Sequence, residues 1–105
     1  MKHYDVIISD KAYNDMEGIY DHINEKLHAP VAAANQYNSI ADAILSLEIM
    51  PERKRLMDSE PERSKGFRIM PINNYSIIFT VKGNLVNIIR VLYSASDIVT
   101  RLREG

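Results

Sequence analysis

"FRIMPINNYSIIFTVKGNLVNIIRVLY", residues 67–93, is the stretch that decides the fold, because it alternates apolar runs with short polar turns. Runs rich in β-branched and aromatic residues favour strands. We therefore expect three strands, at Phe67–Ile72, Tyr75–Val81 and Leu85–Tyr93. The separators, Asn73–Asn74 and Lys82–Asn84, contain residue types that tolerate the positive φ of tight hairpins. The stretch thus predicts an antiparallel meander.

Two amphipathic helices are predicted before the meander. A strand over Tyr4–Ile8 ends at Ser9–Asp10, a pair of residues that favours a helix N-cap. Apolar residues then recur with helical spacing in two stripes, first Ala12, Met16, Ile19, Ile23 and Leu27, then Ala33, Tyr37, Ile40, Ile44 and Leu47. Pro30 ends the first helix, and Pro51 ends the second, which we expect over Pro30–Met50. Because the connection is short, the helices must form an antiparallel hairpin.

The element order β-α-α-β-β-β predicts an α+β fold. We expect a single domain over residues 1–105, in which the antiparallel helical hairpin packs on one face of a mainly antiparallel four-stranded sheet. The other face is expected to stay partly open. Asp97–Arg103 could add a short C-terminal helix capped by Asp97. Residues 51–65, "PERKRLMDSEPERSK", combine two prolines with dense mixed charge, so we expect an irregular surface loop that is a candidate functional segment.

Composition and charge exclude several functions. The chain carries 13 Lys and Arg against 14 Asp and Glu, so no positive field of the whole protein draws it to nucleic acid or an anionic membrane. The absence of cysteine excludes disulfides, thiolate metal sites and a cysteine nucleophile. His3, His22 and His28 have no spacing that places two on one metal, so we expect no metal site and no cofactor. Neither a signal-peptide pattern nor a membrane-spanning stretch is present, which predicts a cytoplasmic protein.

Arg90 is the residue that the apolar pattern does not explain. It lies in the run Ile88–Leu92, where an unpaired buried guanidinium would be costly to desolvate. One interpretation pairs it with a carboxylate such as Asp5 or Asp97, or with strand-end carbonyls, while its stem lies along apolar neighbours. The other places it on the open face near Arg68, in a target-binding or anion-binding surface. We favour the structural interpretation, because buried donors need acceptors whatever else the residue does.

Several motifs, taken in order, are shared with one known family. They are "YDVIIS" before the first helix, "IYDHI" within it, "SLEIMPER" at the end of the second, and then "GFRIMPINNYSIIFTV" and "IIRVLYSASDI". Their order and spacing span essentially the whole chain and resemble the RelE/ParE toxin superfamily, the ParE-type branch most closely. The resemblance implies a bacterial type II toxin–antitoxin system, in which an antitoxin wraps around a small toxin and holds it inactive. One branch cleaves mRNA in the ribosome, whereas the ParE branch inhibits DNA gyrase.

The residues themselves bear on the choice between these activities. RNA cleavage needs cations that stabilise the phosphate and groups that move protons. The ribonuclease branch typically places basic residues late in the first meander strand and just after the last strand. Here those regions read Met70–Ile72 and Tyr93–Ser96, which carry no charged side chain, so we lean towards a toxin that is not an enzyme. If the chain is an mRNA endoribonuclease, the catalytic candidates are Arg68, Arg90 and Tyr93.

The resemblance and the missing basic centre together predict a ParE-like toxin. It would inhibit growth through DNA gyrase, serve plasmid stabilisation and be neutralised by a cognate antitoxin. The alternatives are a ribosome-dependent mRNA endoribonuclease of the RelE type and a non-toxic interaction domain on the same fold. Target or partner contacts are expected from Arg53, Arg55, Arg68, Arg90 and Tyr93. We expect antitoxin residues in a groove between the helical hairpin and the sheet edge, no membrane partner, and no direct DNA binding by the toxin alone.

Overall fold

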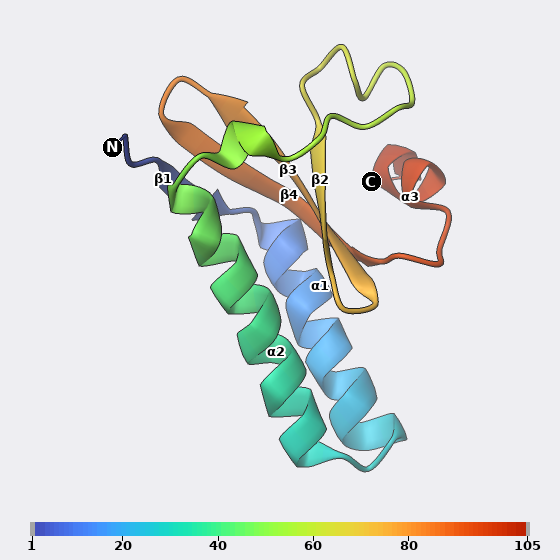
Figure 1. The fold of residues 1–105 in the computed structure, drawn as a ribbon. Helices are drawn as coiled ribbons and strands as arrows, with labels where there is room; N and C mark the ends of the chain where they lie inside the picture. The colour runs from blue at the N-terminus through green and yellow to red at the C-terminus, as the bar shows by residue number, and fades with distance from the viewer. Residues whose placement is uncertain (1, 105) are drawn as a thin grey trace.

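A helical hairpin packs against one face of a twisted sheet, and a short helix lies on the other side (Figure 1). The structure is a computed structural model that describes residues 2–104. Its elements are β1 (Asp5–Ile8), α1 (Asp10–Asp21), η1 (His22–Lys26), α2 (Pro30–Leu45), η2 (Ser46–Glu48), η3 (Pro51–Arg53), β2 (Arg68–Ile72), β3 (Tyr75–Lys82), β4 (Leu85–Tyr93) and α3 (Ile98–Glu104). The sheet order is β1-β4-β3-β2, with β1 parallel to β4 and the other pairs antiparallel. The predicted α+β fold is confirmed.

The helix ends differ from the predicted ones for local reasons. Ser9 caps α1 as expected, because its Oγ accepts a hydrogen bond from the backbone N–H of Ala12 at 3.1 Å. The first arm of the hairpin continues beyond α1 as the π-helix η1. α2 ends at Leu45, before the predicted Met50, because the chain tightens into the 3-10 turn η2. Ile49 then forms an antiparallel bridge with His3, which ties the end of α2 to the N-terminal strand.

The main core lies between the hairpin and the sheet. The helical stripes supply one wall, and alternate residues of the strands supply the other, because strand side chains point to opposite faces in turn. The buried members are Ala12, Met16, Ile40, Ile44, Leu47, Met70, Ile77, Phe79, Val86, Ile88 and Val91. The two helical stripes read from the sequence therefore identify most of the helical wall, but the first stripe runs too far, because Leu27 is 60% exposed.

A second, smaller cluster lies on the opposite sheet face, which the sequence left partly open. Met57, Ile69 and Ile78 are buried there, and α3 packs over them with Ile98, Val99 and Leu102. Segment 51–65 is therefore more than surface loop. Leu56 forms a bridge with Arg68 at the edge of β2, and Met57 is only 5% exposed. α3 and this segment cover part of the face that the hairpin does not reach.

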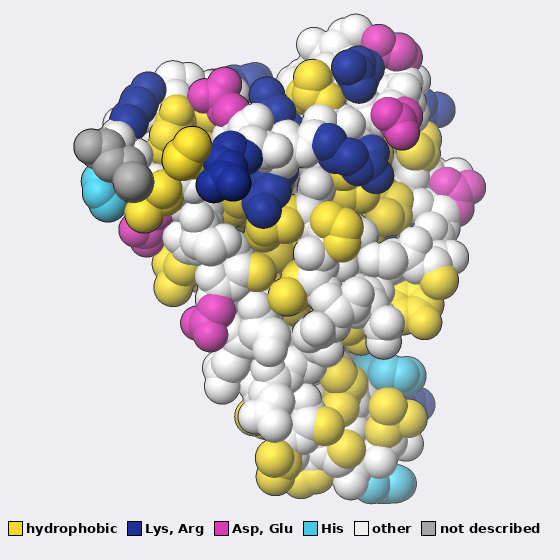
Figure 2. All heavy atoms as spheres, viewed as in Figure 1, with side chains coloured by type: hydrophobic (Ala, Val, Ile, Leu, Met, Phe, Trp, Pro, Cys, Tyr) yellow, Lys and Arg dark blue, Asp and Glu magenta, His cyan; other side chains and the backbone are white. Residues whose placement is uncertain are grey.

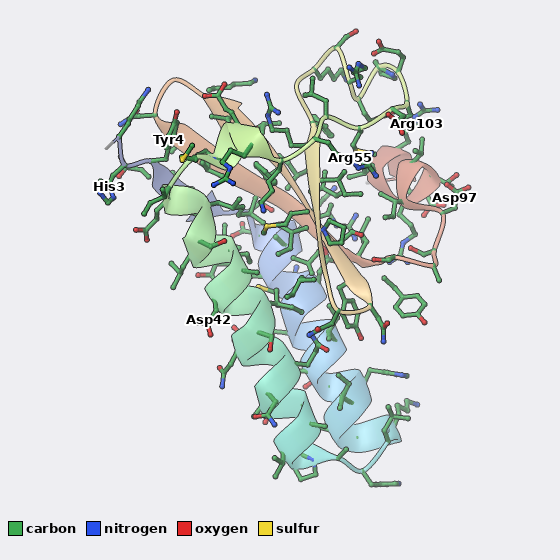
Figure 3. All side chains as sticks on the ribbon, in the orientation of Figure 1. His3, Tyr4, Asp42, Arg55, Asp97 and Arg103 are labelled. Atoms are coloured by element: carbon green, nitrogen blue, oxygen red, sulfur yellow. The ribbon has the colours of Figure 1, made fainter. Side chains whose placement is uncertain are left out.

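Glu62 anchors α3 to the loop before β2. Arg103 donates to its two carboxylate oxygens at 3.0 and 3.1 Å, and Ser59 Oγ donates to Oε1 at 2.7 Å. Arg103 also donates to the carbonyl of Glu60 at 2.7 Å, and its side chain reaches from α3 towards this loop (Figure 3). These hydrogen bonds, those from Arg103 foremost, lower the pKa of Glu62 from its ordinary 4.5 to about 2.

Acid should weaken this anchor over a defined range. Because the folded-state pKa of Glu62 is depressed, its carboxylate stabilises the fold above its ordinary pKa of 4.5, and this contribution is lost as the pH falls towards about 2. We expect Glu62→Gln to lower the urea midpoint near neutral pH. The difference in urea midpoint between the wild-type chain and the Glu62→Gln variant should become smaller as the pH falls below 4.5. Urea unfolding followed by circular dichroism measures it, and a difference independent of pH would contradict the assignment.

Candidate partner-binding cleft

One edge of β4 loses its strand partner halfway along. β1 stops at Ile8, which is paired with Ile88, so the rest of β4 has no neighbouring strand on that side. Ser9, the N-cap of α1, and Asp15 within α1 supply hydrogen bonds in its place. Ser9 donates from its backbone to the carbonyl of Ile88 at 3.1 Å and from Oγ to the carbonyl of Ile89 at 3.0 Å. Asp15 Oδ2 accepts from the backbone N–H of Val91 at 2.9 Å, so the unpaired edge is hydrogen-bonded without a strand.

The same Asp15 carboxylate is the partner of Arg90. Arg90 donates from Nε to Oδ2 at 2.7 Å and from Nη2 to Oδ1 at 2.8 Å, a bidentate geometry. Only 14% of the Arg90 side chain and 13% of the Asp15 side chain are exposed. The hydrogen bonds to Asp15 outweigh burial and raise the pKa of Arg90 above its ordinary value. Arg90 Nη1 also lies 3.5 Å from the carbonyl of Arg101, which links the pair to α3.

The expected carboxylate partners of Arg90 were wrong, although the expectation of a carboxylate was right. Asp5 lies opposite Leu85, at the far end of β4. Asp97 instead caps α3 by accepting from the backbone N–H of Thr100 at 3.1 Å. Asp15 lies on α1 between the apolar positions Ala12 and Met16, and the sequence gives no sign that it faces the β4 edge.

Arg68 lies on the other side of the sheet from Arg90. Arg68 is opposite Phe79, a member of the main core, whereas Arg90 is opposite Ile78, a member of the cluster beneath α3. Directly opposed residues share a face, so the two arginines start from opposite faces. Arg68 Nη1 donates to the carbonyls of Lys54 at 2.7 Å and Glu52 at 3.3 Å, which fixes the chain after η3. The structure therefore does not gather the ribonuclease candidates into one centre.

Among the remaining predicted contact residues, Tyr93 lies on a different element from Arg53 and Arg55. Tyr93 is opposite Tyr75 at the end of β4, is 51% exposed, and packs edge-on against the Tyr75 ring at a centroid distance of 5.8 Å. Arg53 and Arg55 are exposed on the segment that leads to β2, where Figure 3 labels Arg55. Arg55 approaches Asp58 at 3.5 Å, but such exposed ion pairs contribute little stability.

A cleft of about 840 Å³ lies between the hairpin, the β2–β3 turn, the end of β4 and α3. Its apolar lining comes from one face of the first hairpin arm, Ile19, Ile23 and Leu27, and from Tyr75 and Tyr93. Polar lining comes from Asn14, Gln36, Asn74 and Arg101, and Asp15 borders it. Burial raises the pKa of Tyr75, so this phenol stays protonated and can donate. Of the predicted site residues, Tyr93 lines the cleft directly.

Gln36 carries a polar atom that the described residues leave unsatisfied. Its Nε2 is buried and has no hydrogen-bond partner among residues 2–104, while its Oε1 lies 3.5 Å from the amide nitrogen of Asn73. A buried donor without an acceptor costs about 1–3 kcal/mol. A ligand that brought a carbonyl or carboxylate oxygen to Gln36 would recover part of this cost. Apolar rings and helix side chains beside unpaired amide groups suit an extended or helical peptide.

Within residues 2–104 there is no group of three or more His, Asp or Glu side chains placed to hold a metal ion. No helix in this part of the chain has the length and apolar character needed to span a membrane.

Among the solved structures that share the fold, two come from toxin–antitoxin systems. A chain of the chromosomal ParDE toxin–antitoxin system from P. aeruginosa aligns with a TM-score of 0.73 and 25% identity, covering 89% of this chain and 98% of that chain. A chain of the toxin–antitoxin complex RelBE2 from Mycobacterium tuberculosis aligns with a TM-score of 0.60 and 18% identity, covering 87% and 98%. The second likeness concerns the fold alone. The architecture is thus that of the RelE/ParE toxin superfamily.

The sequence match narrows this class to one family. The family model for the ParE toxin of the type II toxin–antitoxin system parDE matches residues 6–98. The chain therefore belongs to the ParE toxin family. Among curated protein sequences, none matches it significantly.

Removing the Asp15 charge should destabilise the fold strongly. Asp15→Ala leaves the largely buried Arg90 without its carboxylate, and breaking one partner of a buried ion pair costs about 3–5 kcal/mol, so we expect about 2–4 kcal/mol for this slightly exposed pair. Arg90→Met in the same chain should recover part of the loss, since no uncompensated charge remains. Urea unfolding of the single and double variants measures both effects. Asp21→Ala, an exposed position on the same helix, is the control and should change stability by less than about 0.5 kcal/mol.

Proposed function

We propose that this chain is a growth-inhibiting toxin that acts by binding DNA gyrase in the cytoplasm and is neutralised by an antitoxin seated in the cleft. When its operon is carried on a plasmid, this activity stabilises the plasmid. Membership of the ParE toxin family over residues 6–98 supports the toxin assignment. The gyrase target is what the resemblance to the ParE branch implies, and the antitoxin contact is proposed from the geometry of the cleft.

One observation supports a toxin that acts by binding rather than by cleaving RNA: both arginines of the sheet are hydrogen-bonded to groups of the fold itself. Arg90 is bound to Asp15, and Arg68 is bound to backbone carbonyls on the opposite side. Phosphodiester cleavage needs cations already aimed at the phosphate, with proton-transfer groups beside them. Tyr93 is exposed and starts from the same face as Arg68, but it is opposite Tyr75, four residues along β3 from Phe79, the residue opposite Arg68. Arg90 starts from the other face. This arrangement favours inhibition by contact over RNA cleavage.

The cleft supports neutralisation by an antitoxin segment. Leu27, which is 60% exposed, and Tyr93, which is 51% exposed, both line it, so apolar area is available to a partner. Gln36 lines it too, and its amide has a donor without an acceptor among residues 2–104. A peptide with spaced apolar side chains and free carbonyl oxygens complements both features. The two similar structures come from toxin–antitoxin systems, which agrees with a protein partner.

Purified chain should inhibit gyrase directly. We expect it to block the supercoiling of relaxed plasmid by gyrase, with no effect on relaxation by a type I topoisomerase, because the proposed contact is with gyrase and not with DNA. The same preparation should leave mRNA intact in a reconstituted translation reaction. Codon-dependent mRNA cleavage without gyrase inhibition would instead assign the endoribonuclease activity. Normal growth at verified protein levels without antitoxin would identify a non-toxic interaction domain.

A charge placed in the cleft should prevent neutralisation. Leu27→Glu puts a carboxylate on the exposed apolar lining, and we expect it to weaken binding of the product of an adjacent small open reading frame by about tenfold or more. Val31→Glu is the matched control, because Val31 is 73% exposed near the same hairpin tip and does not line the cleft. Titration by fluorescence anisotropy measures both. Equal weakening by the two variants would place the antitoxin elsewhere.

A further inference from the structure

The end of α2 furthest from the hairpin tip exposes an unusual run of large apolar side chains. Leu45 is 55% exposed, Ile49 43% and Met50 48%. Single exposed apolar residues are common on soluble proteins, but three within residues 45–50 form a local patch. None of them lines the cleft. We call these residues, together with Arg53 and Lys54, the α2-exit patch.

Cationic side chains adjoin the apolar ones. Arg53 and Lys54 are exposed, and neither has a carboxylate within 4.0 Å among residues 2–104. Arg53 Nη1 lies 4.0 Å from Met50 Sδ, which joins the two parts of the patch. Of the nearby acids, Glu48 is exposed, and Glu52 accepts a hydrogen bond from the Tyr4 hydroxyl at 3.1 Å. Figure 2 shows Lys and Arg side chains gathered beside hydrophobic ones at this end of the molecule.

Met50 is held in a backbone conformation that it does not favour. Its φ of 49° and ψ of 49° are left-handed, which is costly for a residue with a side chain, and it precedes Pro51, which disfavours helical geometry at the preceding residue. The neighbouring contacts impose this geometry. Pro51 is buried, Arg53 N donates to the Met50 carbonyl at 3.1 Å, and Arg68 fixes the chain just beyond. Strain of this kind concentrates at functional positions, and here it holds the Met50 side chain in solvent.

We propose that the α2-exit patch is a second docking surface, which binds an acidic amphipathic segment of a partner protein. Arg53 and Lys54 select carboxylates, and Leu45, Ile49 and Met50 bind apolar side chains of the same segment. Arginine and methionine suit such surfaces, because they combine charge or polarisability with adaptable contact area. A nucleic acid would use the cations but leave the apolar half uncovered. Because the patch and the cleft share no residues, both can be occupied at once.

A designed peptide tests the chemistry of this surface with the intact chain. The probe is a fluorescein-labelled peptide of about 18 residues, or five helical turns, with leucines on one face and glutamates on the adjoining face. We expect saturable binding that weakens at high salt, and binding about tenfold weaker when lysine replaces every glutamate or serine replaces every leucine. Equal binding of the lysine peptide, or no binding of the probe up to its solubility limit, overturns the proposal.

Charge reversal on the protein locates the binding site. Arg53→Glu with Lys54→Glu should weaken probe binding by about tenfold, whereas Lys11→Glu with Lys26→Glu should leave it unchanged. The control pair makes the same change in net charge at exposed positions outside the patch. Equal weakening by both pairs would show that only net charge matters and would overturn the proposal. Displacement of the probe by single-stranded RNA, or self-association of the chain through the patch, would also overturn it.

Met50→Gly separates binding from folding. It removes an exposed apolar side chain and relieves the left-handed strain, so probe binding should weaken several-fold while the unfolding temperature stays equal or rises. His28→Gly is the control, because His28 also has a positive φ, of 51°, outside the patch. It should leave probe binding unchanged. Wild-type probe binding by Met50→Gly would contradict the role given to this residue.

Discussion

Asp15 connects three parts of the molecule, and the remaining arrangement depends on this connection. It belongs to α1, accepts a hydrogen bond from the backbone of β4, and binds the guanidinium of Arg90, which in turn lies beside a carbonyl of α3. A sheet edge without a strand partner needs acceptors and donors from elsewhere, and a largely buried arginine needs a carboxylate. Asp15 supplies the acceptor for both, and Ser9 supplies the donors at the same edge. These contacts fix α1 against the sheet, and α1 residues line one side of the cleft.

The sequence predicted the fold well where apolar periodicity or turn chemistry acts locally. The meander strands were placed almost to the residue, because β-branched runs and the Asn73–Asn74 turn leave few alternatives. The end of α2 was placed too late, because the chain leaves the helix before Pro51 and Met50 adopts a geometry that no local preference favours. The packing of α3 and segment 51–65 on the sheet face opposite the hairpin was not predicted either. Met57 and Glu62 lie in a charged, proline-rich stretch, and their burial depends on contacts with α3 and the sheet.

The candidate site could be predicted only in part. The need for a carboxylate at Arg90 follows from its apolar neighbours, but the choice of Asp15 depends on where β1 stops and on the register shift at Ile78/Phe79. Neither the end of β1 nor this register shift can be predicted from the sequence pattern. Tyr93 was singled out and does line the cleft, whereas Gln36 was not, because a glutamine on a helix surface is ordinary. The acceptors of Arg68 could not be predicted, because they are backbone carbonyls of Glu52 and Lys54, in a segment whose charges and prolines indicate only an irregular loop.

The pairing of the first strand with the last has a kinetic consequence. The hairpin and the meander are local units whose contacts close short loops, and such contacts form early at small entropic cost. Asp15 and Arg90, by contrast, are 75 residues apart, and β1 can add to the sheet only after β4 exists. Until then one side of β4 is an open template for foreign strands. The rate at which the two chain ends meet therefore sets how long a newly made molecule is vulnerable to aggregation.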